Sequence, residues 1–190
     1  MYIQPSASVW KFEGPSTNPD VEAFHRRLPD YGVTPLVNLL DVANELQVGY
    51  VFIKDESSRL GLPAFKILGA SWAIHKAIAA SCSLPLSTSL EELGVAARTQ
   101  NIKLVTCTEG NWGRAVARMA KYLHISATIF VPNSMDQATQ DKISNEGAQT
   151  VVVDGDYDVS IQAAREEATK SNGLLVMDVS WEGYEEIPQV

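Results

Sequence analysis

Lys66 is the residue of this 190-residue sequence whose surroundings first suggest chemistry. It lies between Phe65 and Ile67, where a loop changes into a helical pattern. Because desolvation disfavours the charged form of a lysine, a lysine among apolar neighbours is predicted to have a lowered pKa and to act as an amine nucleophile. Such an amine forms Schiff bases with aldehydes. The local sequence alone favours a simpler interpretation, in which the ammonium group reaches solvent from the first turn of the helix.

A second candidate is the loop Thr106–Gly113, which contains Glu109, Gly110 and Asn111 and follows the start of an apolar run. In an open parallel sheet, ligands bind outside the carboxyl ends of the strands, where helix N-termini present free N–H groups. The loop occupies such a position. Taken alone, it is more typical of an ordinary turn between a strand and a helix, with Asn111 as the helix cap.

Asp178 ends another apolar run, at residues 174–177. On position alone, an aspartate at the end of a strand is a turn or cap residue. Together with Lys66 and Glu109, however, it makes a third titratable side chain in the candidate site. Three such groups can divide proton removal and leaving-group protonation between them.

Four short apolar runs predict the strands of one sheet, at residues 104–107, 127–131, 150–153 and 174–177. Helical patterns separate them, at about residues 112–123, 137–146 and 158–170, and Gly147 is expected to stop the second of these helices. Strands and helices that alternate in this way, with the strands buried on both faces, predict an α/β fold with an open parallel sheet.

The first half of the chain is expected to be less regular. Its predicted elements, in order, are an irregular segment at 1–17, a helix from the Asn18 cap to about Leu28, an extended segment at 34–36, a helix over 39–46 closed by Gly49, a buried strand at 50–53 and a helix over 70–78. A polar connector at 81–89 is interpreted as the crossing into a second lobe. Ser89 and Glu92 are spaced as the capping box of a helix that ends near Arg98.

Composition excludes several classes of function. A hydrophobic content of 45% allows a sizeable core in one domain or two small ones. A net charge of −8 argues against nucleic acid as a partner, because affinity for the phosphate backbone depends on clustered lysine and arginine. Neither a signal peptide nor an apolar stretch of membrane-spanning length is recognisable, so a cytoplasmic location and no membrane partner are expected.

Metal and disulfide chemistry are not expected either. Cys82 and Cys107, the two cysteines, are too few and too isolated for a disulfide framework or a zinc site. Cys107 is interpreted as a small buried residue rather than a nucleophile. The three histidines are scattered along the chain, so no metal site is predicted.

The segment from Lys54 to Ala70, which reads KDESSRLGLPAFKILGA, resembles the Schiff-base lysine segment of the diaminopropionate ammonia-lyases. The likeness continues upstream in FHRRLP (24–29) and VTPL (33–36) and downstream in WEGY (181–184), and covers roughly residues 20–188. These lyases are fold-type II pyridoxal-phosphate (PLP) enzymes and share the fold of the tryptophan synthase β subunit. The resemblance therefore implies that PLP is the cofactor.

The resemblance also implies roles for the site residues. Lys66 would hold PLP as a Schiff base, Asn111 would hydrogen-bond the 3′-hydroxyl of its ring, and Gly110 and Gly113 would complete the cofactor-binding loop. Glu109 and Asp178 would be the catalytic acid–base pair. Glu109 stands where the lyases carry an aspartate and Trp112 where they carry a histidine, so the loop departs from the family's Asp-Gly-Asn-His-Gly pattern at two positions.

By resemblance, the reaction is α,β-elimination of ammonia from 2,3-diaminopropionate, an amino-acid substrate. It gives 2-aminoacrylate, which hydrolyses to pyruvate and a second ammonia. The chain corresponds to the N-terminal portion of such an enzyme, without its glycine-rich phosphate loop. Residues 1–82 would belong to the large PLP domain, 83–178 to a small mobile α/β lobe, and 179–190 to a segment that returns towards the large domain.

Three interpretations remain open from the sequence. The first is the diaminopropionate ammonia-lyase reaction described above. The second is a PLP enzyme of the same fold that acts on another amino acid, as a serine or threonine dehydratase, a racemase or an enzyme of specialised metabolism. The departures at Glu109 and Trp112 favour it. The third is a non-catalytic half-protein that acts through a partner. A homodimer, or association with a chain that supplies the missing half, is the expected assembly.

Overall fold

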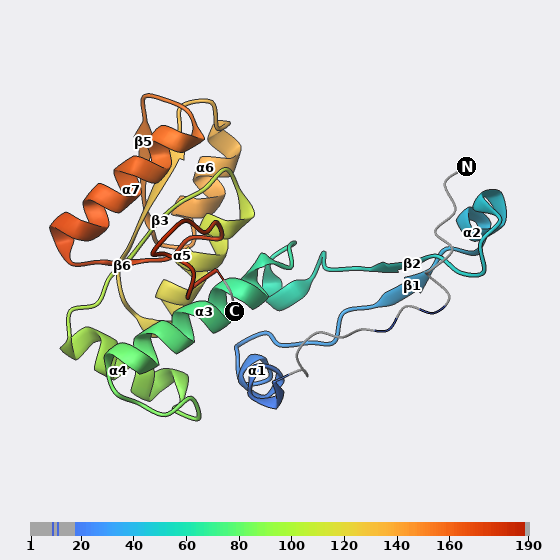
Figure 1. Ribbon diagram of the computed structural model, residues 1–190, viewed down its shortest axis with the longest axis horizontal. Coiled ribbons are helices and arrows are strands. Elements are labelled where there is room, and N and C mark those ends of the chain that lie inside the picture. The colour runs from blue at the N-terminus through green and yellow to red at the C-terminus, as the bar shows by residue number, and fades with distance from the viewer. Residues whose placement is uncertain (1–8, 10, 12–17, 189–190) are drawn as a thin grey trace.

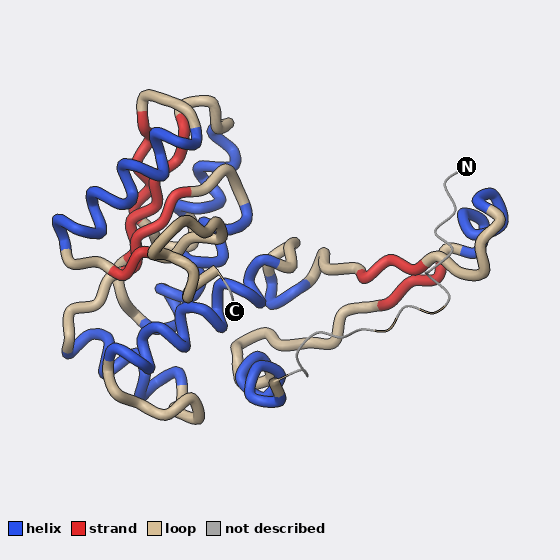
Figure 2. Tube along the Cα trace, viewed as in Figure 1, coloured by secondary structure: helices blue, strands red, loops and turns tan. Residues whose placement is uncertain are grey.

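A computed structural model describes residue 9, residue 11 and residues 18–188 of the chain. The main body is a parallel four-stranded sheet with helices on both faces, and a long arm projects from it (Figure 1; Figure 2). Apart from residues 9 and 11, the irregular segment predicted for residues 1–17 lies outside the described residues.

The sheet contains β3 (Leu104–Cys107), β4 (Ala127–Pro132), β5 (Gln149–Val153) and β6 (Leu174–Leu175), in the order β5-β4-β3-β6. All the pairings are parallel, which confirms the predicted α/β class. β6 is shorter than the predicted run 174–177. Val176 N–H still donates to Val105 O at 2.8 Å, and beyond it the chain leaves the sheet.

Helices cover both faces of this sheet. α5 (Asn111–Leu123) and α6 (Gln137–Ser144) lie on one face and α7 (Tyr157–Ser171) on the other (Figure 1). Alternate strand residues point to opposite faces. Val105 and Cys107 pack with Ala164 of α7, whereas Ile129 packs with Ala117 of α5. β3 is buried throughout, as predicted, but β5 lies at the sheet edge and is only partly buried, so the expectation of two covered faces is wrong there.

A second core joins the sheet to the helices that precede it. It contains residues of α1 (Pro19–His25), α3 (Lys66–Ser81), α4 (Leu90–Thr99) and α5, among them Phe24, Trp72, Ile74, Leu93 and Met119. Because this core draws on residues both before and after the connector at 81–89, it does not decide the lobe boundary at residue 82, which stays a prediction.

Local signals set the ends of several helices as expected. The Asn18 side chain accepts from Asp20 N–H at 2.9 Å to open α1, and Ser89 and Glu92 form the predicted capping box of α4. The second helix of the sheet region, α6, stops at Ser144, slightly before the predicted end, and Gly147 follows with a positive φ of 97°.

The arm is an antiparallel hairpin of β1 (Leu36–Asn38) and β2 (Phe52–Lys54), with α2 (Leu40–Leu46) at its far end (Figure 1). We call residues 33–54 the hairpin arm. The predicted buried strand at 50–53 is wrong in its burial, because Tyr50 is 71% and Phe52 51% exposed. α2 buries only Ala43, and it ends at Gln47 in a left-handed conformation rather than at Gly49. Within the described residues nothing covers the arm, so its apolar residues lie open.

The base of the arm is held by polar contacts that converge on Thr34. Lys54 Nζ donates to Thr34 O at 2.5 Å, and Arg59 donates to Thr34 Oγ1 at 2.6 Å. Glu56 pairs with Arg59 at 2.5 Å, and this hydrogen-bonded guanidinium lowers the pKa of Glu56 to about 2. The Lys-Asp-Glu-Ser-Ser-Arg part of the segment noted in the sequence therefore fixes the point from which the chain enters α3.

The same base is tied to the sheet region. Arg118 of α5 donates to Leu60 O at 3.0 Å and pairs with the buried Glu146 at 2.6 Å. Leu60 and Gly61 both have positive φ values, of 49° and 67°, in the short turn η2 (Arg59–Gly61) that makes this contact. Arg118 thereby anchors the turn that precedes Lys66 to the helix that follows the Thr106–Gly113 loop.

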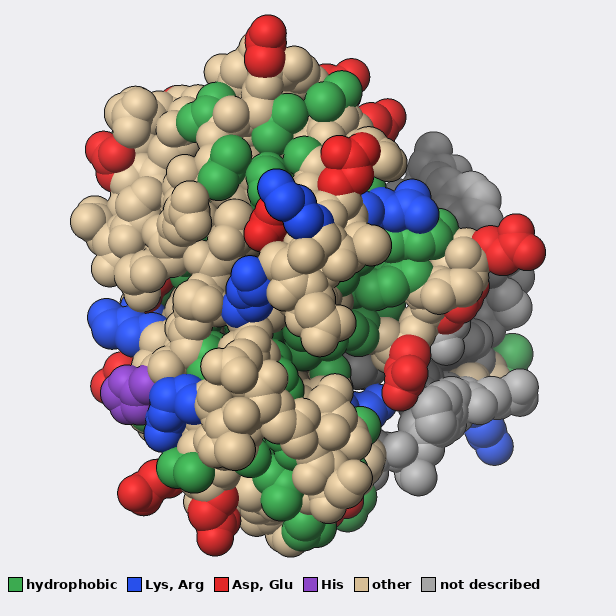
Figure 3. Space-filling view, turned by 90° about the vertical axis from the view of Figure 1, so that its left-hand side faces the viewer, with side chains coloured by type: hydrophobic (Ala, Val, Ile, Leu, Met, Phe, Trp, Pro, Cys, Tyr) green, Lys and Arg blue, Asp and Glu red, His purple; other side chains and the backbone are tan. Residues whose placement is uncertain are grey.

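The surface carries charges of both signs. On the face shown in Figure 3, Lys and Arg side chains are interspersed with Asp and Glu. In the part of the chain that the structure describes, no helix has the length and apolar character needed to cross a lipid bilayer.

Candidate active site

Lys66 and Asp178, 112 residues apart in the chain, form an ion pair in which Lys66 Nζ donates to Asp178 Oδ2 at 2.5 Å. Lys66 is the first residue of α3, and Asp178 lies just beyond the carboxyl end of β6. Their side chains are 39% and 23% exposed. The purely apolar setting predicted for Lys66 is therefore wrong. Phe65 is 63% exposed, and a carboxylate faces the amine.

A cavity of about 230 Å³ opens at this pair. Its lining consists of Phe65, Lys66, Leu68, Gly69, Trp112 and Asp178. Lys66 and Asp178 are the charged residues of this lining, and the other lining residues are apolar. A larger cavity, of about 660 Å³, lies beside α1 and shares only Leu68 and Gly69 with this lining. Since it contains none of the predicted site residues, we assign the site to the smaller cavity, the Lys66 pocket.

Trp112 connects the pocket to the sheet. It is 7% exposed, and its indole Nε1–H donates both to Thr106 Oγ1 at 3.2 Å and to Val176 O at 3.0 Å. These contacts tie the carboxyl ends of β3 and β6 together beside Lys66. The sequence identified Trp112 as a departure from the lyase pattern, and the structure shows that it is a buried bridge between neighbouring strands.

Thr108 organises the loop between β3 and α5. Its Oγ1 accepts from Gly110 N–H at 2.9 Å and from Gly113 N–H at 3.0 Å. Gly110 occupies the N-cap position and has no side chain, and Thr108 instead accepts from the first turn of α5, so the interpretation of Asn111 as the cap is wrong. Asn111 is instead an exposed residue at the start of α5. Sequence reasoning missed Thr108, although a threonine two residues before a glycine is a known signal for such a turn.

Gly113 is needed at its position for packing. A Cβ there would meet Thr108 Cγ2 at 2.4 Å and Ile129 Cγ2 at 3.0 Å. The residue is buried and its N–H already donates to Thr108. Close approach of α5 to β4 and to the loop therefore explains this glycine, and its predicted place among the cofactor-binding residues stays a prediction.

Glu109 and Asp178 follow neighbouring parallel strands, since β3 and β6 pair with Val105 opposite Leu175. Glu109 is exposed. Cys107, next to both, is fully buried, as predicted. Burial, together with the nearby charges of Asp178 and Glu109, raises the pKa of the Cys107 thiol to about 12. The thiol is therefore protonated at neutral pH and is no nucleophile there.

Tyr157, at the start of α7, also belongs to this group of side chains. It packs against the cluster that contains Cys107 and Met177. Its pKa is raised, first by burial and then by the charges around it, which include those of Asp178 and Glu109. No feature of the sequence marked it as a site residue.

The described residues contain no group of three or more His, Cys, Asp or Glu side chains arranged to hold a metal ion.

Comparison with known proteins places these residues in a family. Residues 27–188 match the family model PALP, described as pyridoxal-phosphate dependent enzyme. The chain belongs to this family. The fold-type II class predicted from the sequence is confirmed, since the parallel sheet and its helices match solved structures of that class.

Among curated proteins of the family, the chain is 39% identical over 173 residues to a diaminopropionate ammonia-lyase of Salmonella typhimurium. This match covers 89% of the chain and 43% of the relative. Diaminopropionate ammonia-lyase from Escherichia coli in its apo form superimposes with a TM-score of 0.83 at 36% identity, covering 89% of this chain and 46% of that one. The resemblance to this group of lyases is confirmed, and the chain spans less than half the length of these relatives.

The same E. coli enzyme has been solved in complex with an aminoacrylate-PLP azomethine reaction intermediate. That structure matches with a TM-score of 0.80 at 35% identity, over 89% of this chain and 42% of the other. This chain is thus similar in fold to an enzyme solved with that intermediate bound.

The packing role of Gly113 yields a prediction with a matched control. Gly113→Ala should lower the free energy of unfolding by about 1–3 kcal/mol, because the new methyl group overlaps the Thr108 side chain. Gly69→Ala, in α3 where a Cβ would meet nothing within 4 Å, should raise it by about 0.5–1 kcal/mol. Urea denaturation of the two variants measures both. A Gly113→Ala protein as stable as the wild type would contradict the packing role.

Proposed function

We propose that this chain carries the Schiff-base lysine and acid–base groups of a PLP-dependent ammonia-lyase acting on 2,3-diaminopropionate or a related amino acid. The observation that carries the proposal is the contact of Lys66 Nζ with Asp178 Oδ2 at 2.5 Å, in a pocket at the carboxyl end of the sheet. The identity of 39% to a diaminopropionate ammonia-lyase supports this choice of substrate.

The described residues of the Lys66 pocket suit the aldehyde and ring of PLP. The amine stands at one side, Leu68 and Trp112 supply apolar walls, and Gly69 leaves space, because a Cβ there would meet nothing within 4 Å. When bound, PLP supplies an aldehyde for the lysine and an electron-withdrawing ring that stabilises negative charge at the substrate Cα. Gly110 and Asn111, at the start of α5, would contact the ring side of the cofactor.

Lys66 and Asp178 would exchange a proton within the pocket. The ammonium form of Lys66 cannot attack an aldehyde, and Asp178 Oδ2 lies within hydrogen-bond reach to accept the proton that must leave. Asp178 would then return this proton when substrate displaces the lysine. The ion pair thus provides both an anchor for the cofactor and a proton store for the reaction.

Elimination needs a second proton carrier. The Cα proton goes to a base, the Cβ–N bond breaks, and the leaving amine takes up a proton to depart as ammonia. We assign these two transfers to Asp178 and Glu109, which follow adjacent strands. Asp178 lines the Lys66 pocket, whereas Glu109 is exposed and is not among the lining residues, so a reacting group in the pocket would lie closer to Asp178 than to Glu109.

The alternative proposal is an enzyme of the same family that acts on a different amino acid. Trp112 favours it, because its indole fills space beside Lys66 and commits its N–H to the strand bridge. Such a wall leaves no titratable group at this position. The division into residues 1–82, 83–178 and 179–190, the mobility of the middle part and a cytoplasmic location stay proposals under either substrate.

We also propose that the hairpin arm is covered by another protein surface in the working enzyme. Its exposed apolar residues include Val33, Leu36, Leu40, Leu46, Tyr50, Phe52 and Ile53. Monomeric proteins rarely leave so contiguous an apolar segment open to water. A second copy of the chain, or a chain that supplies the remaining part of the family fold, would provide the cover.

The lysine assignment is tested by trapping. With PLP in millimolar excess and borohydride, peptide mapping should place the pyridoxyl label on Lys66. Lys66→Ala should remove the label, whereas Lys76→Ala, on the same helix, should retain it. A label on Lys54 or Lys76 in place of Lys66 would overturn the assignment.

The carboxylates are tested in a preparation that turns over diaminopropionate. Asp178→Asn should lower kcat by about 10²–10⁴-fold, because it removes a proton carrier, while Lys66 is still labelled. Glu109→Asp restores the family residue and should raise kcat, by up to about 100-fold if placement limits the rate. An unchanged or lower kcat for Glu109→Asp would favour the alternative substrate.

The arm is tested by light scattering of the purified protein. Wild-type chain should form dimers or larger species, and a Leu36→Lys, Phe52→Lys double variant should shift it towards monomer, because each charge disfavours apolar contact. Val95→Lys, at a position on α4 that is 52% exposed, is the matched control and should associate like the wild type. A monomeric wild type that binds PLP at micromolar affinity and releases ammonia would refute the need for cover.

A further inference from the structure

The turn Trp181–Tyr184 closes the free edge of β6 with a single side chain. The Tyr184 hydroxyl donates to Leu175 O at 2.9 Å and accepts from Met177 N–H at 2.9 Å. In a parallel sheet, one residue of a strand bonds the carbonyl of residue i−1 and the amide of residue i+1 on its neighbour. The hydroxyl makes this pair of bonds around Val176. It therefore replaces one residue of a neighbouring strand at the sheet edge.

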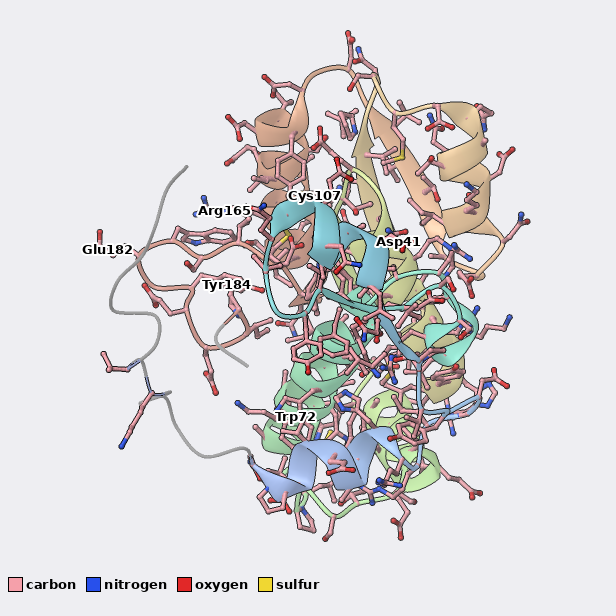
Figure 4. The ribbon with its side chains drawn as sticks, turned by 90° about the vertical axis from the view of Figure 1, so that its right-hand side faces the viewer. Asp41, Trp72, Cys107, Arg165, Glu182 and Tyr184 are labelled. Atoms are coloured by element: carbon pink, nitrogen blue, oxygen red, sulfur yellow. The ribbon has the colours of Figure 1, made fainter. Side chains whose placement is uncertain are left out.

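The phenol is held in place from outside by stacked groups. The Trp181 and Tyr184 rings stack at 4.4 Å with 14° between their planes, and Arg165 of α7 lies 4.9 Å above the Trp181 ring. The main chains of Trp181 and Tyr184 also pair, and Gly183 has the positive φ of 82° that the turn needs. In Figure 4, Glu182 lies at the outer end of this turn and Tyr184 nearer the body.

The Tyr184 hydroxyl stays protonated and can therefore act as a hydrogen-bond donor. Burial raises the pKa of Tyr184 to about 12, so the phenol is neutral over the pH range in which enzymes work. A neutral hydroxyl can donate to one group and accept from another at the same time, which the Leu175 and Met177 contacts require.

These contacts end one residue before Asp178. Trp112 holds the Val176 carbonyl on the other side, so the segment from Leu175 to Met177 is fixed on both sides by side chains. We propose that Tyr184 is a positioning residue, which sets the direction in which Asp178 leaves β6 and so keeps its carboxylate on Lys66. This inference rests on the proposed function of the Lys66–Asp178 pair.

Tyr184→Phe removes the hydroxyl and keeps the ring stack. Exchange of the Met177 amide should become at least about tenfold faster, because its acceptor is gone. The pH profile of Lys66 labelling by PLP and borohydride should shift in the same direction as in Asp178→Asn. Where the protein turns over substrate, kcat should fall about 10–100-fold with KM within twofold. Tyr31→Phe, between α1 and the hairpin arm, should behave as wild type in all three measurements.

Two results would overturn the proposal. One is a Lys66 labelling profile that stays at the wild-type position in Tyr184→Phe while Asp178→Asn shifts it, and the other is an unchanged Met177 exchange rate. If Tyr184→Phe does not fold, Trp181→Leu removes the stack and keeps the hydroxyl, and should give a smaller shift in the same direction. A preparation that contains the complete family fold and shows the expected labelling shift, but has no lyase activity, would refute the proposed lyase reaction and leave the positioning role standing.

Discussion

Parallel pairing of β3 with β6 is the constraint on which the site depends. A parallel neighbour can be reached only by a crossover, and here the chain passes through β4 and β5 before it returns beside β3. Both carboxyl ends then face the same edge of the sheet, and the residues that follow them, Glu109 and Asp178, share that edge. The other residues of the site are held in place by contacts to the carboxyl ends of these two strands.

Those contacts come from distant parts of the chain and are mostly polar. Arg118 holds the turn before α3, and α3 in turn places Lys66 against Asp178. Trp112 ties the two central strand ends from inside the fold. Because these links are hydrogen bonds and an ion pair, they fix the direction of the side chains as well as their separation, which an apolar core of equal size would not provide.

The sequence allowed much of this to be predicted, for identifiable reasons. The strands, the helices between them and the capping box at Ser89 all follow from periodicity and local capping, which need only near neighbours in the chain. Lys66 and Asp178 emerged from the family resemblance, and the structure brings their side chains into contact. Pairing across 112 residues, however, is decided by topology, and no local pattern contains it.

The predictions that failed concern burial and side-chain partners. Tyr50 and Phe52 have strand-like, apolar sequence, but burial depends on what lies opposite, and the described chain places nothing there. Trp112 and Thr108 act through hydrogen bonds to groups that the fold brings to them. A sequence shows that an indole or hydroxyl is present, and it does not show which carbonyl or amide the group will meet.

The buried thiol of Cys107 has a consequence for chemical selectivity. Thiolates, like amines, add readily to aldehydes, and Cys107 is the last residue of β3, the strand that leads into the loop of the candidate site. The raised pKa of about 12 leaves the Cys107 thiol protonated at neutral pH, and the side chain is fully buried. The two carboxylates that we assign to proton transfer help to keep that sulfur protonated. Burial and these charges together therefore keep Cys107 from competing with Lys66 for an aldehyde.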